Sequence, residues 1–475
     1  MALVVGFGGH VRHGGFVADD WTNLATYRFG PHHGGVGAVA DYRQVDLPSA
    51  NHAALPVLFT AEYALLGDHV RLHILLALAL AVLLSLALYA FARELGAPGW
   101  FAVTLAVLAF VYPFSDANRF WIAAGWNNLA LVLYFGGAVL ALRRKPHAFT
   151  FVAFVAAILI YELVTVAVAL TGVLYLLRME RREALLRWAA DIVAAVVGVL
   201  LVMALTPRAP LGTTSEKFHH AGEIAKQSLT LWADTLWPFG GLGRGVAVAI
   251  LLAALAVGVW RRSRWVWAAV GAIAFVVVGY LVLVPAEDFY TPLYPGIGNR
   301  INLMAGIGMI ALVLALAAML PGARIVVPIV AAVIGVGFVV KLRDHSGDYT
   351  RSAQIQGREL SGLRALVPHP PPGTTIYLRQ PTPETAPGIP TFSWRWDLSG
   401  ATKVTYGDPS VPGYPIASTT KLVCEADGIH PQGNGLEAFT AAYGHAILVD
   451  VDNSRVSGPD DPASCRATMW PSTAR

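Results

Sequence analysis

The sequence predicts an all-α polytopic membrane bundle of about ten membrane segments, followed by a C-terminal soluble domain of α/β or β-rich type. Three observations lead to this fold class. Hydrophobic residues make up 56% of the chain and charged residues only 13%, whereas soluble proteins carry about 25% charged residues. The apolar residues gather in runs long enough to cross a bilayer. Beyond residue 340 the composition becomes polar and rich in proline.

Composition also excludes several classes of function. The net charge of +4 over 475 residues is too small an excess of cations for nucleic-acid binding. Two cysteines, Cys424 and Cys465, are too few for a disulfide scaffold, an iron–sulfur cluster or a cysteine zinc site. We therefore expect membrane lipid and lipid-linked molecules as partners, and no nucleic acid.

The membrane segments follow from the length of each apolar run, because a helix needs about 20 apolar residues to cross the hydrocarbon core. Clear runs lie at residues 72–92, 126–142, 188–206, 265–284, 301–320 and 325–340. Shorter runs lie at 100–114 and 245–260. The stretch 148–177 is compatible with one long helix or with two short ones.

Clusters of basic residues between the runs predict the orientation, because short cytoplasmic loops collect Lys and Arg. The clusters begin at Arg93, Arg143, Arg178, Arg261 and Arg324. All five lie on the inner face only if 148–177 crosses the membrane twice. The two short helices would then meet near Tyr161 and Glu162 on the outer side.

This orientation places every long polar segment outside the cytoplasm: residues 1–71, 115–125, 207–244, 285–300 and 341–475. The chain then divides into an outer first loop (1–71), a transmembrane helical domain (72–340) and an exocytoplasmic soluble domain (341–475). Ala, Val and Gly are abundant and Arg outnumbers Lys, which is typical of a high-GC bacterium. We therefore expect a multi-pass protein of the bacterial plasma (inner) membrane, with energy or activated groups arriving through the membrane.

The start of the chain raises a question about export of the first loop. Residues 1–9 are apolar but too short to span a bilayer, and they lack the features of a signal peptide. Either the run 72–92 acts as a reverse anchor, or a first helix lies upstream of this sequence. The second reading is favoured, because the first nine residues resemble the end of a span.

The polar tail shows the spacing of a helix at 351–366, a stiff break at His369–Gly373, and short β-like runs at 375–378, 403–406, 421–424 and 446–451. Cys424 and Cys465 would both lie in an oxidising compartment, so we expect a disulfide between them. The tail is expected to act either as a lid or acceptor-binding module, or as a packing cap.

Two adjacent carboxylates, Asp19 and Asp20, lie among aromatic residues in the first outer loop. A carboxylate there could act as a general base toward a hydroxyl, and the pair could hold a divalent cation such as Mg or Mn. The alternative is structural, because Asp-Asp ahead of Trp21 is also a helix N-cap signal.

Three further residues are candidates for substrate binding. Glu162 is an ionisable residue within an apolar stretch, where charge is costly and usually functional. Arg300 directly precedes the run 301–320 on the outer face, where it could share an anion with the free amides of a helix N-terminus. Arg119, in the loop 115–125, could do the same. The alternatives are that Glu162 is a structural partner for a buried arginine or for backbone amides, and that the two arginines anchor the protein at the membrane interface.

Together these features resemble the C-type (GT-C) integral membrane glycosyltransferase superfamily: an acidic pair in a long first outer loop, a short hairpin with Tyr161-Glu162 at its outer turn, Arg300 at the outer mouth of a late helix, and a soluble C-terminal domain. The resemblance implies transfer of a sugar from a polyprenyl-phosphate carrier to a glycan, lipid or protein acceptor. It implies that Asp19 or Asp20 is the base or a metal ligand, that Arg300 neutralises the phosphate leaving group, and that Glu162 lines the donor or acceptor cavity.

Two other classes of function remain open at this stage. A transporter or flippase of lipid-linked sugars would show polar residues at mid-membrane and symmetry between two halves. The sequence shows no such symmetry, and its polar residues gather on one face, which favours an enzyme. A glycan polymerase or ligase on another fold would share the same compartment and substrates.

Overall fold

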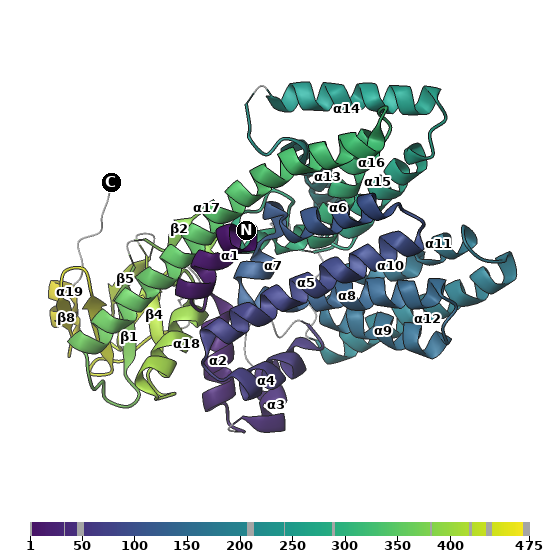
Figure 1. Ribbon diagram of the computed structural model, residues 1–475. Coiled ribbons are helices and arrows are strands. Elements are labelled where there is room, and N and C mark those ends of the chain that lie inside the picture. Colours follow the sequence, from purple (N-terminus) through teal and green to yellow (C-terminus); the bar gives the residue numbers. More distant parts are fainter. Residues whose placement is uncertain are drawn as a thin grey trace. The chain divides into compact units, whose positions relative to one another are not determined.

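The structure is a computed structural model that describes residues 2–32, 34–44, 52–206, 213–241, 243–286, 290–380, 382–417, 420–433 and 439–468 (Figure 1). The chain forms two compact units. The helical unit comprises Met1–Gly9, Asn51–Leu55 and Ile74–Ser346, and the mixed unit comprises His10–Ala50, Pro56–His73 and Gly347–Arg475. This grouping differs from the three predicted ranges, because the early polar segment belongs with the tail.

Helices make up the helical unit. In chain order they are α1 (Ala2–His13, which continues into the mixed unit), α5 (Val70–Glu94), α6 (Gly99–Phe110), η3 (Pro113–Ser115), α7 (Ala117–Phe120), α8 (Ile122–Leu142), α9 (His147–Ile160), η4 (Glu162–Val164), α10 (Thr165–Leu170), α11 (Gly172–Leu176), α12 (Arg181–Leu205), α13 (Thr214–Leu236), α14 (Gly243–Trp260), α15 (Trp265–Leu281), η5 (Gly296–Asn302), α16 (Leu303–Ala317) and α17 (Ala323–Leu366).

Six of the described helices are long and apolar enough to cross a membrane: α5, α8, α12, α14, the continuous segment of η5 and α16, and α17. The α6, α9 and α15 helices and the segment Glu162–Leu176 are apolar but shorter. The predicted runs therefore form helices, and a multi-pass membrane protein is supported. The number of about ten crossings stays a prediction.

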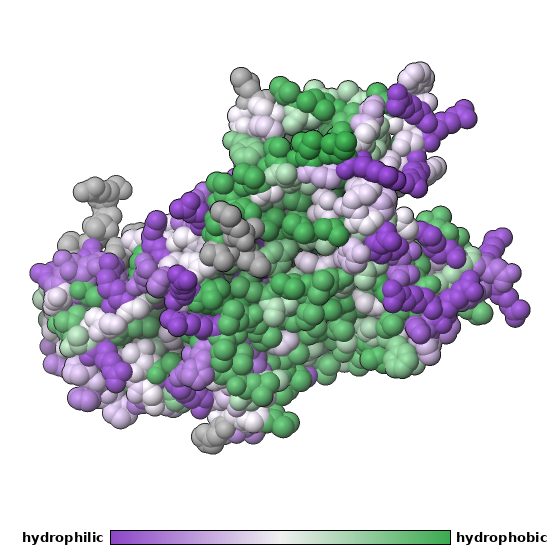
Figure 2. Space-filling model, viewed as in Figure 1, coloured by the Kyte–Doolittle hydropathy of each residue, from purple (hydrophilic) through white to green (hydrophobic). Residues whose placement is uncertain are grey.

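Hydrophobic side chains cover much of the outer surface of these helices. On α5, Leu72, Leu75, Leu83 and Leu86 are each between 45% and 59% exposed, and Figure 2 shows hydrophobic residues along this helix. By contrast, the segment formed by η5 and α16 is 83% buried. An apolar surface of this kind is stable in lipid and unfavourable in water, so it indicates the lipid-facing side of the unit.

Small residues bring α15 and α16 close together. A Cβ added to Gly279 would lie 2.9 Å from the backbone nitrogen of Ala305, and one added to Gly308 would lie 2.8 Å from a side-chain carbon of Val276. Membrane helices pack through such small residues, because lipid supplies no hydrophobic drive for their association. This packing fixes α16, which follows directly after Arg300.

The stretch 148–177 is broken where the charge pattern predicts a break. α9 ends at Ile160, Tyr161 is extended (φ −154°, ψ 110°), and η4 begins at Glu162. The choice between one long helix and two short ones is thus settled in favour of two. Whether the pair crosses the membrane twice stays a prediction.

The helix predicted at 351–366 is present, but it is the end of the 44-residue α17, which begins at Ala323 within the last apolar run. The polar residues between the two predicted elements contain no proline, so the helical hydrogen bonds continue through them. The predicted boundary between residues 340 and 341 therefore falls within a helix, and the two compact units divide this helix after Ser346.

The mixed unit combines early helices with a small sheet. The helices are α2 (Asp19–Phe29), η1 (Gly35–Gly37), α3 (Ala38–Gln44), α4 (Leu55–Leu66), α18 (Arg395–Tyr406) and α19 (Pro462–Thr468). The strands are β1 (Thr375–Arg379), β2 (Glu384–Ala386), β3 (Ile389–Pro390), β4 (Gly413–Ile416), β5 (Lys421–Cys424), β6 (Ile429–Gln432), β7 (Ala446–Asp450) and β8 (Arg455–Ser457). The main sheet has the order β4-β1-β7-β8, with β1 parallel to both β4 and β7, which makes the unit α/β.

Most predictions for the tail are confirmed, and one is wrong. Strands form at the predicted runs 375–378, 421–424 and 446–451, and Cys424 and Cys465 form a disulfide. Residues 403–406 are the last turn of α18, not a strand. The buried Asp397 carboxylate accepts the Leu398 N–H (2.6 Å) in the first turn, and Gly407 (φ 68°) ends the helix in the left-handed conformation.

Candidate functional site

The acidic pair lies in the first turn of α2, in the mixed unit. The residue before it, Ala18, has φ 52° and ψ −121°, a costly conformation for a residue with a Cβ. Asp20 is fully buried, and its Oδ2 accepts the Val17 N–H at 3.0 Å. Asp19 is 5% exposed, and its Oδ1 accepts the indole N–H of Trp396 at 2.8 Å. The N-cap position is occupied by Ala18. The two carboxylates differ in their contacts: Asp20 stabilises the turn, and Asp19 contacts α18.

The seam between α2 and α18 holds Asp19 in place. The Thr22 hydroxyl donates to the Trp396 carbonyl, and the Trp21 indole donates to Gln356 Oε1 at 2.7 Å. A Cβ added to Gly400 would lie 2.6 Å from the Thr22 nitrogen, so only glycine permits this approach of the two helices. The acidic pair is therefore carried on a firmly packed element.

A third carboxylate, Asp397, lies in the same seam. Burial raises the pKa of Asp397 well above its ordinary value, the hydrogen bonds from backbone N–H groups lower it, and the charge of Asp19 raises it further. Asp397 thus holds its proton more tightly than an ordinary aspartate. Asp20 and Asp397 accept backbone N–H groups, whereas Asp19 accepts the side-chain N–H of Trp396.

Arg300 lies in η5 of the helical unit, between two aromatic rings. Its guanidinium carbon is 5.2 Å from the Trp121 ring centre and 5.4 Å from the Tyr290 ring centre. It donates to the Ile297 carbonyl (3.1 Å) and to the Tyr290 hydroxyl (3.2 Å). Within the described ranges no carboxylate forms an ion pair with this half-buried cation. Such a guanidinium retains donors for an oxyanion.

A polar network behind Arg300 fixes its backbone. The buried Asp116 carboxylate accepts Asn299 Nδ2 at 2.6 Å and pairs with His345 on α17. Asn299 Oδ1 accepts the Ala117 N–H at 3.1 Å, and Asn118 Nδ2 donates to the Arg300 carbonyl at 3.0 Å. The loop before α8 and the segment before α16 are thereby fastened together. Sequence reasoning missed Asp116 and His345, since they are 229 residues apart and neither belongs to a motif.

Glu162 lies at the break between α9 and η4. Its Oε2 is 2.9 Å from His52 Nδ1, and its Oε1 has no hydrogen-bond partner among the described residues. The neighbouring Tyr161 ring lies 5.7 Å from the His52 ring and within electrostatic reach of both Arg300 and Glu162. Two of the predicted residues, Glu162 and Arg300, thus share one neighbourhood of the helical unit. The sequence contains no signal for the partner His52.

Arg119 has a different environment. It lies on α7 next to η5, is only 1% exposed, and donates from its guanidinium to the Tyr112 carbonyl. These surroundings favour a role in holding the loop before α8. Its predicted role in anion binding stays a prediction.

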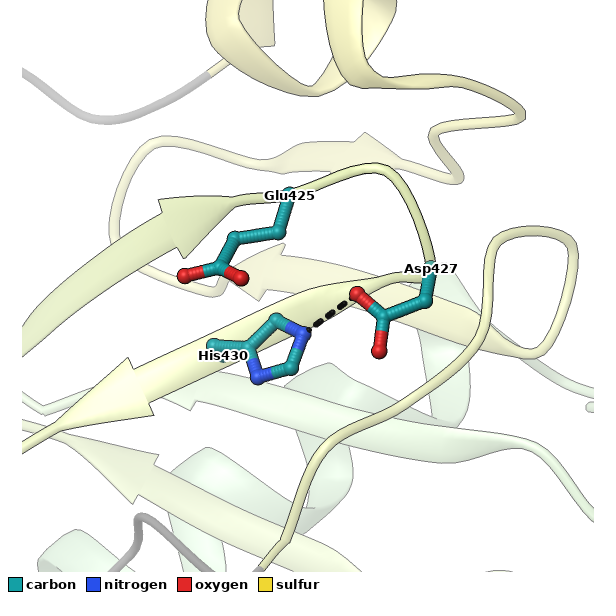
Figure 3. A group of neighbouring side chains, drawn as sticks. All are labelled: Glu425, Asp427 and His430. Carbon is teal, nitrogen blue, oxygen red and sulfur yellow. Dashed lines mark hydrogen bonds and ion pairs between the residues drawn. The ribbon is translucent and has the colours of Figure 1, made fainter.

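Ligand atoms for a metal ion come together at one place in the described part of the chain. Glu425, Asp427 and His430 gather at the turn between β5 and β6 (Figure 3). His430 Nε2 is 2.8 Å from Asp427 Oδ1, and Thr440 Oγ1 is 3.1 Å from His430 Nδ1, so both ring nitrogens already have protein partners. Among the described residues, Asp19 and Asp20 are not joined by a third ligand of this kind.

Comparison with known proteins gives one match. No protein-family model matches the chain, and no curated protein matches it. Among solved structures, the chain is similar to the crystal structure of ArnT from Cupriavidus metallidurans in the apo state, with 15% identity and a TM-score of 0.34. The match covers 87% of this chain and 84% of that chain. At this level of similarity, function has to be argued from the residues themselves.

Proposed function

We propose that this chain is a membrane glycosyltransferase of the C-type architecture, which moves a sugar from a polyprenyl-phosphate carrier to an envelope acceptor on the outer face of the bacterial plasma membrane. The observation that carries the proposal is Arg300, a half-buried guanidinium held between Trp121 and Tyr290 with no carboxylate partner in the described ranges. Its position near the start of the apolar segment formed by η5 and α16 suits the phosphate of a membrane-bound carrier.

The reaction needs a base at the acceptor and positive charge at the leaving group. In the proposed step, the Asp19 carboxylate takes the proton of the acceptor hydroxyl, whose oxygen attacks the anomeric carbon of the sugar. The bond between that carbon and the phosphate oxygen breaks, and polyprenyl phosphate leaves with the bonding electrons. Arg300 stabilises the charge that develops on the departing phosphate.

The other predicted residues support this step. Asp20 shapes the turn that presents Asp19, since its carboxylate accepts the Val17 N–H. Glu162 Oε1, which has no hydrogen-bond partner among the described residues, is suited to accept a hydrogen bond from a sugar hydroxyl, while His52 orients the other oxygen. Arg119 is proposed to add positive charge to the donor site from the position in which its guanidinium bonds the Tyr112 carbonyl.

The test is release of polyprenyl phosphate by the purified protein from a panel of polyprenyl-phosphate sugars. We expect turnover by the wild type, a loss of about 10²–10⁴-fold in Asp19→Asn, and a loss of about 10²–10³-fold in Arg300→Ala. Asp20→Asn is expected to lose less, because an amide oxygen can still accept the Val17 N–H. Asp460→Asn and Arg351→Ala, exposed residues of the mixed unit, are the matched controls.

Two outcomes would contradict the proposal. The first is full activity in both Asp19→Asn and Arg300→Ala, which would remove the site assignment. The second is no turnover with any donor, in which case movement of lipid-linked sugars across vesicle membranes would test the transporter or flippase alternative. A parallel assay with EDTA examines the role of the acidic pair as ligands of Mg or Mn, since a general base keeps its activity in chelator and a metal site loses it.

A further inference from the structure

A cavity of about 370 Å³ lies in the mixed unit, beside the seam of α2 and α18. Its lining comes from α2, α3, α18 and β4, together with Phe439 and residues of the connecting loops. This volume falls within the range of about 300–1,000 Å³ that is typical of small-molecule sites. Trp396 lines the cavity and also donates its indole N–H to Asp19, so one side chain connects the cavity with the proposed base.

The charges that line the cavity favour an anion. Lys403 is half-buried, and no described residue forms an ion pair or a side-chain hydrogen bond with its ammonium. Burial lowers the pKa of Lys403, because the charged ammonium is favoured less in a partly buried site than in water. Arg395 adds a second cation, with its guanidinium carbon 5.0 Å from the Phe439 ring centre.

Among the described residues of the lining, the carboxylate is Asp41, and it is already engaged. Its Oδ1 is 2.6 Å from His32 Nδ1, and its Oδ2 accepts the His32 N–H at 3.2 Å. The described lining therefore presents the ammonium of Lys403 and the guanidinium of Arg395, together with a carboxylate that already bonds His32. A cationic ligand would be repelled by the ammonium of Lys403, and a neutral ligand would supply no opposite charge to offset its partial burial.

The uncharged part of the lining favours a sugar ring. Trp396, Tyr414 and Phe439 offer aromatic surface on which the C–H face of a pyranose can pack. Thr26, Ser399 and Gln44 add hydroxyl and amide groups that can bond sugar hydroxyls. A bare inorganic anion would leave most of this surface unused, and a lipid chain would leave the polar groups unpaired.

We propose that this cavity binds a saccharide that carries a negative charge, a phosphate or a carboxylate, with Lys403 and Arg395 holding the anion and the aromatic residues holding the ring. The inference rests on the proposed function in one respect, namely that the bound saccharide is the acceptor whose hydroxyl Asp19 deprotonates. Binding itself is independent of that step.

The experiment is isothermal titration calorimetry on the full-length protein in detergent, with glucose 1-phosphate, glucuronic acid, glucose and inorganic phosphate as separate probes. We expect the two anionic sugars to bind at millimolar concentration or better, and more tightly than glucose or phosphate. Lys403→Gln and Arg395→Gln are each expected to weaken binding by about tenfold or more, since hydrogen bonds to charged groups contribute more than neutral ones. Lys421→Gln, an exposed lysine of the same unit, is the control.

Several outcomes would overturn the inference: no binding of either anionic sugar, equal binding of glucose, or unchanged affinity in both Lys403→Gln and Arg395→Gln. Two variants are used so that a folding defect in one of them does not decide the result. Binding and turnover also separate the two proposals. Saccharide binding without turnover would contradict the glycosyltransferase proposal and support the cavity assignment. Turnover without saccharide binding would support the glycosyltransferase proposal and contradict the cavity assignment.

Discussion

Lys403 is the residue whose protonation should govern saccharide binding. Burial lowers its pKa, and the charged or titratable groups around it are Arg395, the Asp41–His32 pair, and Tyr414, whose pKa burial raises to about 12. Only the ammonium form attracts an anion. As pH rises through the lowered pKa of Lys403, the proton is lost, and we expect affinity for glucose 1-phosphate to fall at a pH below that at which an ordinary lysine titrates.

Titrations across neutral and alkaline pH would measure this effect in the wild type and in Lys403→Arg. Arginine stays protonated throughout, so the fall in affinity should disappear from that window in the variant. An identical fall in both proteins would show that another group controls binding. Lys403→Gln is expected to be weak at every pH.

Single residues also show what the sequence could and could not reveal about the site. Glu162 stood out because an acidic residue in an apolar stretch is costly, and the structure gives it a partner, His52, which lies 110 positions away. Asp19 and Asp20 looked equivalent in the sequence. Only the fold distinguishes them, because the contact of Asp19 with Trp396 joins residues 377 positions apart.

At the scale of elements, the seam of α2 and α18 joins the proposed base to the proposed saccharide cavity. Gly400→Ala would place a methyl group 2.6 Å from the backbone of Thr22, which cannot move aside as a side chain could. We expect this variant to destabilise the mixed unit by about 1–3 kcal/mol and to weaken both saccharide binding and turnover. Thermal unfolding, calorimetry and the polyprenyl-phosphate assay would measure the three effects.

The matched control is Gly357→Ala, on α17 of the same unit, where no atom lies within 4 Å of an added Cβ. Alanine there should be neutral or stabilise the helix by up to about 1 kcal/mol, because glycine is a poor helix former. If Gly400→Ala behaves like Gly357→Ala, the close approach of α2 and α18 has no bearing on either function.

Elements differ in how well the sequence predicted them, and the reason is physical. The thickness of the bilayer determines the length and apolarity of a membrane helix, so these two properties of a run suffice to predict one. The break at Tyr161 was predicted from the clusters of basic residues alone. The prediction of a strand at 403–406 was wrong, because it gave the β-branched residues there more weight than the local signals for a helix. The last turn of α18 is instead decided by its packing against β4 and by the left-handed Gly407.

At the scale of the whole molecule, the orientation of the chain is the prediction on which the outer-face chemistry depends. If 148–177 crosses the membrane twice, residues on either side of it lie on the same face, and the basic clusters place that face inside. A single crossing would put them on opposite faces. Lys145, before α9, and Glu180, after α11, are both exposed and suit this comparison.

Cysteine labelling in intact cells can decide between these arrangements, because the two natural cysteines are joined in a disulfide and give little background. We expect Lys145→Cys and Glu180→Cys to resist a membrane-impermeant maleimide until the membrane is permeabilised. Asp452→Cys, on the exposed turn between β7 and β8, should react at once. Labelling of Glu180→Cys but not of Lys145→Cys in intact cells would mean a single crossing. The sites after it would then change sides, and Arg300 would face the cytoplasm, where a polyprenyl-phosphate donor of the outer leaflet cannot reach it.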